Sequence, residues 1–148
     1  MNSAYLHLAI NHIPVIGLPL VLIFLVHSLC IKNPASQKFA LKMLVFLAAL
    51  GVAVFFTGEP AEEVVEHLPD ITEGTIHNHE EAAEVSLVFM ILSGVAALAA
   101  LWFSKDESKN SRIRWAVAGI ATLTLLSLGY TANLGGKIRH SEIELKSN

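Results

Sequence analysis

The stretch Thr75-Ile-His-Asn-His-Glu-Glu-Ala-Ala-Glu84 leads directly into the apolar segment Val85–Phe103. It brings two histidines and three glutamates to the head of a segment long enough to cross a membrane, because a bilayer core needs about 20 apolar residues. A charged group at the centre of a bilayer costs roughly 2.5–3.5 kcal/mol, so polar clusters at membrane depth usually have a function. The stretch therefore predicts a membrane-spanning helix with a candidate site at its head.

Small residues follow one side of this predicted helix. At spacings of three and four, that side holds His79, Ala83, Ser86, Met90, Ser93 and Ala97. A face of small side chains allows a neighbouring helix or a flat cofactor to approach closely. Because His79 stands at the top of this face, we take it as the leading candidate ligand.

The composition indicates that the rest of the chain also lies in lipid. Of the 148 residues, 53% are hydrophobic and 16% are charged, and the mean hydropathy is +0.56. A soluble domain of this size has too little interior to bury so much apolar surface. The net charge of −3 gives no reason to expect a nucleic acid partner, and the single cysteine, Cys30, cannot form an internal disulfide.

Four apolar segments define the predicted architecture. We expect one domain over residues 1–148, an all-α integral membrane bundle of four antiparallel helices. Its spans lie at about 5–31, 37–57, 75–103 and 112–134. After the second span, Pro60 suits the first turn of a helix whose apolar stripe is Ala61, Val64, Val65 and Leu68. This pattern predicts a short amphipathic helix on the outer surface.

The basic residues predict the orientation of the bundle. Seven of the ten flank the first and third connections: Lys32, Lys38, Lys42, Lys105, Lys109, Arg112 and Arg114. The second connection, 58–81, has none. By the positive-inside rule, connections one and three are cytoplasmic, and both termini and the second connection face outward. Nine of the thirteen acidic residues lie in 59–84, which indicates a solvated face or a docking surface for a basic soluble partner.

The histidines gather on the predicted outer side. Six of the seven fall there: His7, His12, His67, His77, His79 and His140. His7 shares a helix face with Asn11, whereas His12 lies about 140° round the helix from His7. Because the first, third and fourth spans are antiparallel, their histidines meet at one depth. Histidine is the commonest metal ligand, and bundles build cofactor sites between facing helices.

Two features predict irregular helix near this face. Pro14 and Pro19 each remove a backbone donor, so we expect the outer half of the first span to be distorted. Gly135-Gly136 can end the fourth helix, which would place His140 on a turn.

Haem b bound by paired histidines fits the constellation best. It needs neutral imidazoles on facing helices, small residues beside the ring and cations for its propionates. His12, His79 and His140 can supply imidazoles, and Lys137 and Arg139 can hold the propionates. A second stripe, on the fourth span, can supply room: Gly119, Thr122, Leu126, Gly129, Asn133 and Gly136.

Two other interpretations of the histidines remain open. One is a non-haem metal site, because His77, Glu80, Glu81 and Glu84 have helical spacings that can bind zinc, copper or a metal pair. The other is that no cofactor is bound. The histidines would then hydrogen-bond the backbone carbonyls that the two prolines free.

Three short motifs extend over the chain: His7-x-x-x-x-His12-x-Pro14, His79-Glu80 at the head of a span, and Gly135-Gly136 followed by His140. Together they resemble a family of small bacterial four-span membrane proteins of uncharacterised function that are suspected of binding b-type haem. The chain departs from the family's pattern in a shorter spacing from the glycine pair to the last histidine. The resemblance implies His7, His12, His79 and His140 as the set of interest, in a bacterial cytoplasmic membrane.

The predicted function is electron transfer through one or two bis-histidine haems b near the outer face. The candidate iron ligands are His7, His12, His77, His79 and His140, with Asn11 beside them. Expected partners are the bilayer, other subunits of a respiratory complex or a further copy of the chain, a soluble cytochrome, or quinol. Nothing resembles a catalytic nucleophile, a phosphate-binding loop or a hydrolase triad, so we expect an electron carrier rather than a stand-alone enzyme.

Two alternatives to this function stay open. The first is a cofactor-free accessory subunit of a membrane complex. It predicts a further small-residue stripe facing lipid, for which Gly94, Ala97 and 100–101 are candidates. The second is a non-haem metal-binding membrane protein that gathers cations at its acidic mouth.

Overall fold

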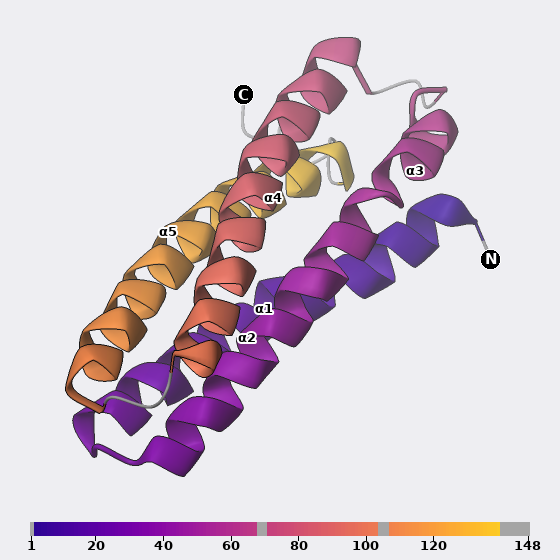
Figure 1. Cartoon of the computed structure of the whole chain (residues 1–148). Helices are drawn as coiled ribbons and strands as arrows, with labels where there is room; N and C mark the ends of the chain where they lie inside the picture. The colour runs from indigo at the N-terminus through magenta and orange to yellow at the C-terminus, as the bar shows by residue number, and fades with distance from the viewer. Residues whose placement is uncertain (1, 68–70, 104–106, 140–148) are drawn as a thin grey trace.

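The computed structural model describes residues 2–67, 71–103 and 107–139. Its helices are α1 (Ser3–Cys30), α2 (Pro34–Phe55), α3 (Gly58–Val65), α4 (Glu73–Trp102) and α5 (Glu107–Arg139). These described residues include no strand, so the all-α prediction is confirmed. The four long helices, α1, α2, α4 and α5, alternate in direction along the chain (Figure 1).

The long helices close into a bundle. Contacts join α1 to α2, α2 to α4, α4 to α5 and α5 to α1, so α1 and α4 stand diagonally across the bundle (Figure 1). Four helical segments are long and apolar enough to cross a membrane: Ser3–Cys30, Pro34–Val65, Glu73–Trp102 and Ser111–Ile138. The chain is therefore a multi-pass membrane protein, as its composition predicts.

Polar residues just outside the apolar runs begin three of the helices. The side chains of Asn2, Asn33 and Thr72 accept hydrogen bonds from first-turn amides of α1, α2 and α4. Pro34 follows the cap of α2, at a position where its missing N–H costs no helical bond. The helices therefore begin a few residues before the predicted spans, which were placed by apolar runs alone.

The helix end expected at Gly135-Gly136 is not observed, and the prolines of the first span lie within a continuous helix. α1 continues through Pro14 and Pro19, and α5 continues through Gly135 and Gly136 to Arg139. In lipid no water competes for backbone groups, so a helix is the cheapest conformation even for residues that end helices in water. The straight passage of α5 matters for the site, because it keeps Gly135 against α4.

The apolar core lies nearer to one end of the bundle. We call this the basic end, because it carries Lys32, Lys38, Lys42 and Arg112; the opposite end, with His7, α3 and His79, is the histidine end. The buried core residues are Leu18, Leu25, Leu29, Ala40, Leu41, Leu44, Leu47, Ala97, Ala100, Val117, Ala118 and Ala121. All four long helices contribute to this core.

Helices α2 and α4 approach closely through small residues. A Cβ atom at Gly94 would lie 2.6 Å from the Cβ of Ala48, a distance that only a glycine permits. Ala97 and Ala100 are fully buried in the same interior. The prediction that these three residues of α4 face lipid is therefore wrong: they serve packing within the bundle.

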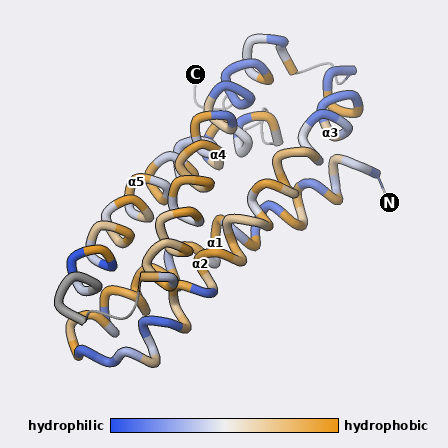
Figure 2. The backbone as a smooth tube through the Cα atoms, viewed as in Figure 1, coloured by the Kyte–Doolittle hydropathy of each residue, from blue (hydrophilic) through white to orange (hydrophobic). Residues whose placement is uncertain are grey.

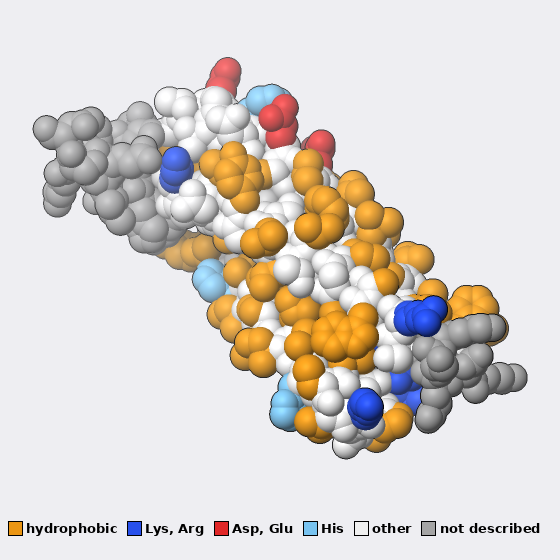
Figure 3. Space-filling view, turned by 90° about the vertical axis from the view of Figure 1, so that its left-hand side faces the viewer, with side chains coloured by type: hydrophobic (Ala, Val, Ile, Leu, Met, Phe, Trp, Pro, Cys, Tyr) orange, Lys and Arg blue, Asp and Glu red, His pale blue; other side chains and the backbone are white. Residues whose placement is uncertain are grey.

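The outer surface separates into an apolar middle and polar ends. Hydrophobic side chains cover the middle, whereas the acidic side chains gather at one end and most of the basic ones at the other (Figure 3). Along the backbone, hydrophilic residues lie on α3, at the start of α4 and at the connection between α1 and α2 (Figure 2). Exposed Trp102 and Trp115 lie toward the basic end, and exposed Tyr5 and Tyr130 toward the other. Aromatic residues at both boundaries are typical of membrane proteins.

The short helix α3 covers the histidine end of α1. It packs against α1, and the hydroxyl of Ser3 donates a hydrogen bond to the carbonyl of Pro60. Ala61 is buried while Glu59 and Glu63 are exposed, so the predicted amphipathic helix is confirmed. Thr57, the residue before α3, lies beside His7.

Candidate cofactor site at the histidine end

His7 is held by the end of α2. Its half-buried ring has Nδ1 2.8 Å from the hydroxyl oxygen of Thr57. The Thr57 hydroxyl itself donates to the carbonyl of Val54, at 2.6 Å. Because that bond uses the hydroxyl hydrogen, the Thr57 oxygen accepts from the His7 Nδ1–H. The ring is then the tautomer that carries a lone pair on Nε2, the form in which a neutral imidazole binds a metal.

His79 is held in the same way by α5. Its Nδ1 lies 3.1 Å from the backbone carbonyl of Thr131, which can only accept, so Nδ1 carries the hydrogen. The lone pair is again on Nε2. A Cβ at Gly135 would lie 3.0 Å from Cε1 of His79 and 3.4 Å from Nδ1, so the ring rests on bare backbone. Gly135 therefore leaves the space in which this imidazole sits.

The two histidines lie at the same end of the bundle, both half-buried. They belong to α1 and α4, which stand diagonally across the bundle. Glycines flank them on both sides: a Cβ at Gly58 would lie 4.0 Å from Cε1 of His7, and Gly135 lies against His79. This arrangement presents two imidazoles, each fixed through Nδ1, with small residues around them.

A seam of hydroxyl groups joins α4 to α5 below His79. The Ser86 hydroxyl lies 2.7 Å from that of Ser127 and 2.8 Å from that of Thr131. Deeper in the bundle, Ser93 and Thr124 are 2.7 Å apart. Thus Ser86 and Ser93 point inward, as the predicted face of α4 requires, and a neighbouring helix occupies that face. The seam also fixes Thr131, whose carbonyl holds His79.

The other predicted ligands lie elsewhere. His12 is exposed, and its Nδ1 is bonded to the carbonyl of Leu8 in its own helix. His77 is exposed and pairs with Glu81 one turn further on, at 3.3 Å. Asn11 is half-buried one turn below His7. The structure therefore keeps His7 and His79 half-buried at one end of the bundle, whereas His12 and His77 lie on the surface.

The remaining predicted site residues lie at the end of α5. Lys137 is exposed there, at the histidine end, where a cation can meet a propionate. Arg139 is the last residue of α5, and His140 lies outside the described residues. The predicted stripe of α5 does not line the site. Its members Gly119, Thr122, Leu126, Gly129 and Asn133 are all exposed on the outer side.

Sequence reasoning missed the residues that hold the histidines. Thr57 and Thr131 drew no attention, and Gly135 was considered only as a helix breaker. Two of them, Thr57 and Gly135, could have been considered from the sequence. A hydroxyl or a glycine near the end of a span is well placed to contact an imidazole at the same depth. For Thr131 the contact uses a backbone carbonyl, which no side-chain pattern reveals.

The described residues limit the kinds of ligand set that the site can offer. Within the described parts of the chain, no group of three or more histidine, cysteine, aspartate or glutamate side chains is placed to hold a metal ion. Two Nε2 atoms on facing helices suffice for haem, which supplies the other four iron ligands itself. Comparison with protein-family models, curated proteins and solved structures finds no match for this chain.

Proposed function

We propose that this chain is a membrane-bound b-type cytochrome, in which His7 and His79 hold a haem between α1 and α4. One observation supports this most strongly. Each imidazole donates its Nδ1–H to a fixed acceptor, the Thr57 hydroxyl or the Thr131 carbonyl, and keeps the Nε2 lone pair. Metal-ligating histidines usually have such a partner on the other nitrogen, since it fixes the ring and makes it a stronger ligand.

The chain's own residues have definite parts in this proposal. His7 and His79 would hold the haem iron, and the haem would supply the transfer of one electron at a time. Thr57 and the Thr131 carbonyl orient the two rings. Gly58 and Gly135 leave backbone, rather than side chains, next to the imidazoles. The surrounding helices exclude water, and Lys137 is a candidate partner for a propionate.

The location follows from charge. Lys32, Lys38 and Lys42 mark the basic end, which the positive-inside rule assigns to the cytoplasm. The site and both chain ends then face the outside of a bacterial cytoplasmic membrane. The acidic residues of α3 and α4 surround this outer end, where a basic soluble cytochrome or a larger respiratory complex can exchange electrons with the haem.

The test is a reduced-minus-oxidised visible spectrum of protein purified in mild detergent, with haem quantified as its pyridine complex. We expect α and Soret bands typical of haem b. His7→Ala and His79→Ala should each remove that signal, while His12→Ala and His77→Ala, which alter exposed rings, should keep it. Folded wild-type protein without haem, or haem retained in both of the first two variants, would overturn the proposal.

A second candidate is a cofactor-free accessory subunit, and the exposed side of α5 favours it. Gly119 and Gly129 lie there with nothing within 4 Å of an added Cβ, so another helix can approach the backbone closely. This function predicts a flat visible spectrum from folded protein. It also predicts that Gly129→Leu releases the chain from a partner complex recovered with it from the native membrane.

A further inference from the structure

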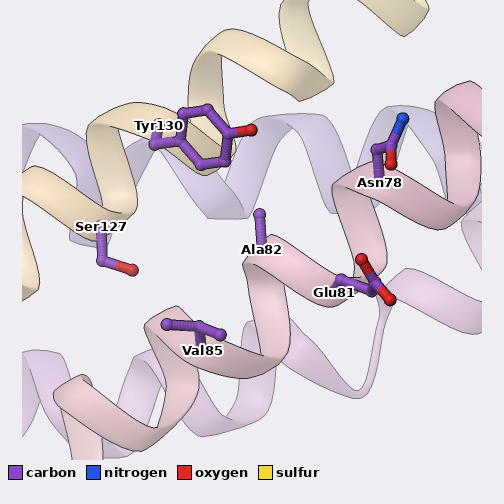
Figure 4. Close-up of a pocket in the computed structure, with 6 residues that line it drawn as sticks. All are labelled: Asn78, Glu81, Ala82, Val85, Ser127 and Tyr130. Atoms are coloured by element: carbon purple, nitrogen blue, oxygen red, sulfur yellow. The ribbon is translucent and has the colours of Figure 1, made fainter.

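A groove opens between α4 and α5 beside the histidine site. Figure 4 shows its six lining residues, Asn78, Glu81, Ala82, Val85, Ser127 and Tyr130. Its volume is about 250 Å³ and it is open to the surroundings of the bundle. An apolar cavity of about 150 Å³ already holds a benzene ring, so this groove is large enough for a substituted ring.

The groove is polar at one end and apolar at the other. Asn78 and Glu81 belong to the hydrophilic head of α4, whereas Val85 begins its apolar run. The Tyr130 hydroxyl is directed toward the side on which Asn78 stands (Figure 4). From residue 78 to 85 the helix rises about 10 Å, so the groove crosses the boundary between membrane surface and hydrocarbon. Its occupant needs a polar ring and an apolar tail.

The charges define the polar part of that occupant. None of the six lining residues is basic, and Glu80 and Glu84 stand beside Glu81 on the exposed side of α4. The negative charges of these glutamates repel the phosphate of a lipid headgroup. A carboxylate instead accepts a hydrogen bond from a neutral hydroxyl, and the amide of Asn78 can donate or accept. The groove therefore favours an uncharged ring that carries hydroxyl groups.

Thr131 links the groove to His79, through hydrogen bonds of its side-chain hydroxyl on one side and of its backbone carbonyl on the other. Ser127, on its wall, lies 2.7 Å from Ser86, which lies 2.8 Å from Thr131. The carbonyl of Thr131 then accepts from the Nδ1–H of His79. Asn78 and His79 are consecutive residues, so the groove and the imidazole lie within about one helix diameter, 10–12 Å.

On the exposed side, Glu81 is linked to water. His77 lies 3.3 Å from its carboxylate and is itself exposed. The Glu81 carboxylate therefore stands at the solvent-facing edge of the groove, where it can accept a hydrogen bond from a ring hydroxyl.

We infer that this groove binds the hydroxylated ring of a lipid-soluble quinol, with Glu81 and Asn78 on the ring hydroxyls and the tail along Val85. The inference rests on the proposed function, because it names the class of molecule that exchanges electrons with the site. The binding itself requires no haem, so it can be measured independently.

The first measurement is the affinity of a short-tailed benzoquinol for the detergent-purified protein, kept reduced under argon. Glu81→Gln removes the carboxylate acceptor, and we expect about tenfold weaker binding, as for loss of a hydrogen bond to a charged group. Ala82→Phe should fill the groove and abolish binding. The matched controls are Glu84→Gln, a neighbouring exposed glutamate outside the groove, and Ala116→Phe, an exposed alanine of α5. Equal affinities in all these variants would overturn the inference.

The second measurement locates the ligand. An azido-substituted benzoquinone should label peptides that contain 78–85 and 127–130, and excess phospholipid should not prevent labelling. Labelling at the basic end, or complete protection by phospholipid, would contradict a quinol site here.

The haem-free variant His79→Ala separates this inference from the proposed function. Quinol binding that persists in this variant supports the groove even if wild-type protein contains no haem. Haem-containing wild-type protein that fails to bind the benzoquinol would overturn the groove assignment and leave the cytochrome standing.

Discussion

The buried polar groups at the two ends of the bundle have different hydrogen-bonding arrangements. At the basic end, the Gln37 amide donates to the Ser28 carbonyl at 2.9 Å, and Arg114 donates to the Gln37 side-chain oxygen. At the histidine end, the Nδ1 atoms of His7 and His79 are held by Thr57 and by the Thr131 carbonyl. The first arrangement holds helices together, and in the second the Nε2 atoms are the proposed haem ligands.

Side-chain packing also differs between the two ends. Leu41, Leu44 and Leu25 are almost completely buried around the basic half. Around His7 and His79 the neighbours are glycines and threonines, and both rings are only half-buried. The comparison teaches that one half of the bundle is tightly packed by large apolar side chains, whereas the other half, which holds the proposed site, is packed with small residues. Substitutions in the two halves should therefore affect different properties.

The largest effect on stability should come from the basic half. Leu41→Ala leaves a cavity at a fully buried position, and we expect a loss of about 2 kcal/mol in the free energy of unfolding. The value lies at the low end because unfolded membrane helices still bury leucine in lipid. Unfolding in mixed micelles with increasing SDS measures it. Leu20→Ala, at an exposed position, is the control; equal losses in both variants would refute the assignment of the core.

The next effect concerns cofactor affinity. Thr57→Val keeps the shape of the side chain but removes the acceptor of the His7 Nδ1–H. We expect about tenfold weaker haem binding, the lower range for loss of such a partner, with little change in unfolding. Titration of haem into haem-free protein measures it. Thr122→Val, which removes a hydroxyl bonded only to its own helix at Ala118, should leave affinity unchanged.

A smaller effect should follow at the glycine pair of α5. Gly135→Ala puts a Cβ 3.0 Å from the His79 ring, which must then shift by a few tenths of an ångström. We expect severalfold weaker haem binding in the same titration. Gly136→Ala is a matched control, because nothing lies within 4 Å of its added Cβ. If both variants bind haem equally well, the ring does not depend on Gly135.

The smallest effect should come from the seam of hydroxyl groups that joins α4 to α5. Ser93→Ala removes the hydroxyl that bonds Thr124 within the bundle. Such bonds between membrane helices contribute about 0.6 kcal/mol on average, and we expect a loss of that size in the free energy of unfolding. Ser111→Ala, at an exposed position, should change nothing. Weaker haem binding in the Ser93 variant would show that the seam supports the site as well as the fold.

Much of the fold could be predicted from the sequence, because few backbone conformations can cross a lipid bilayer. Apolar runs near 20 residues predict spanning helices, and the four predicted spans match α1, α2, α4 and α5 within a few residues at most ends. The apolar stripe after Pro60 predicted α3. The expected helix break at Gly135 was wrong, since propensities measured in water lose weight where the backbone has no water to bind.

The sequence by itself determined which residues share a depth in the membrane, and it placed His7, His12, His77 and His79 at one end. Tertiary structure alone decided which of them face inward. His7 and His12 lie about 140° apart on one helix, so a single rotation of α1 can bring only one of them toward His79. A helix that is apolar all round has no preferred side in lipid, because tails and protein interior are equally apolar. The close packing of Gly94 against Ala48, and of Gly135 against His79, fixes how each helix is rotated about its own axis.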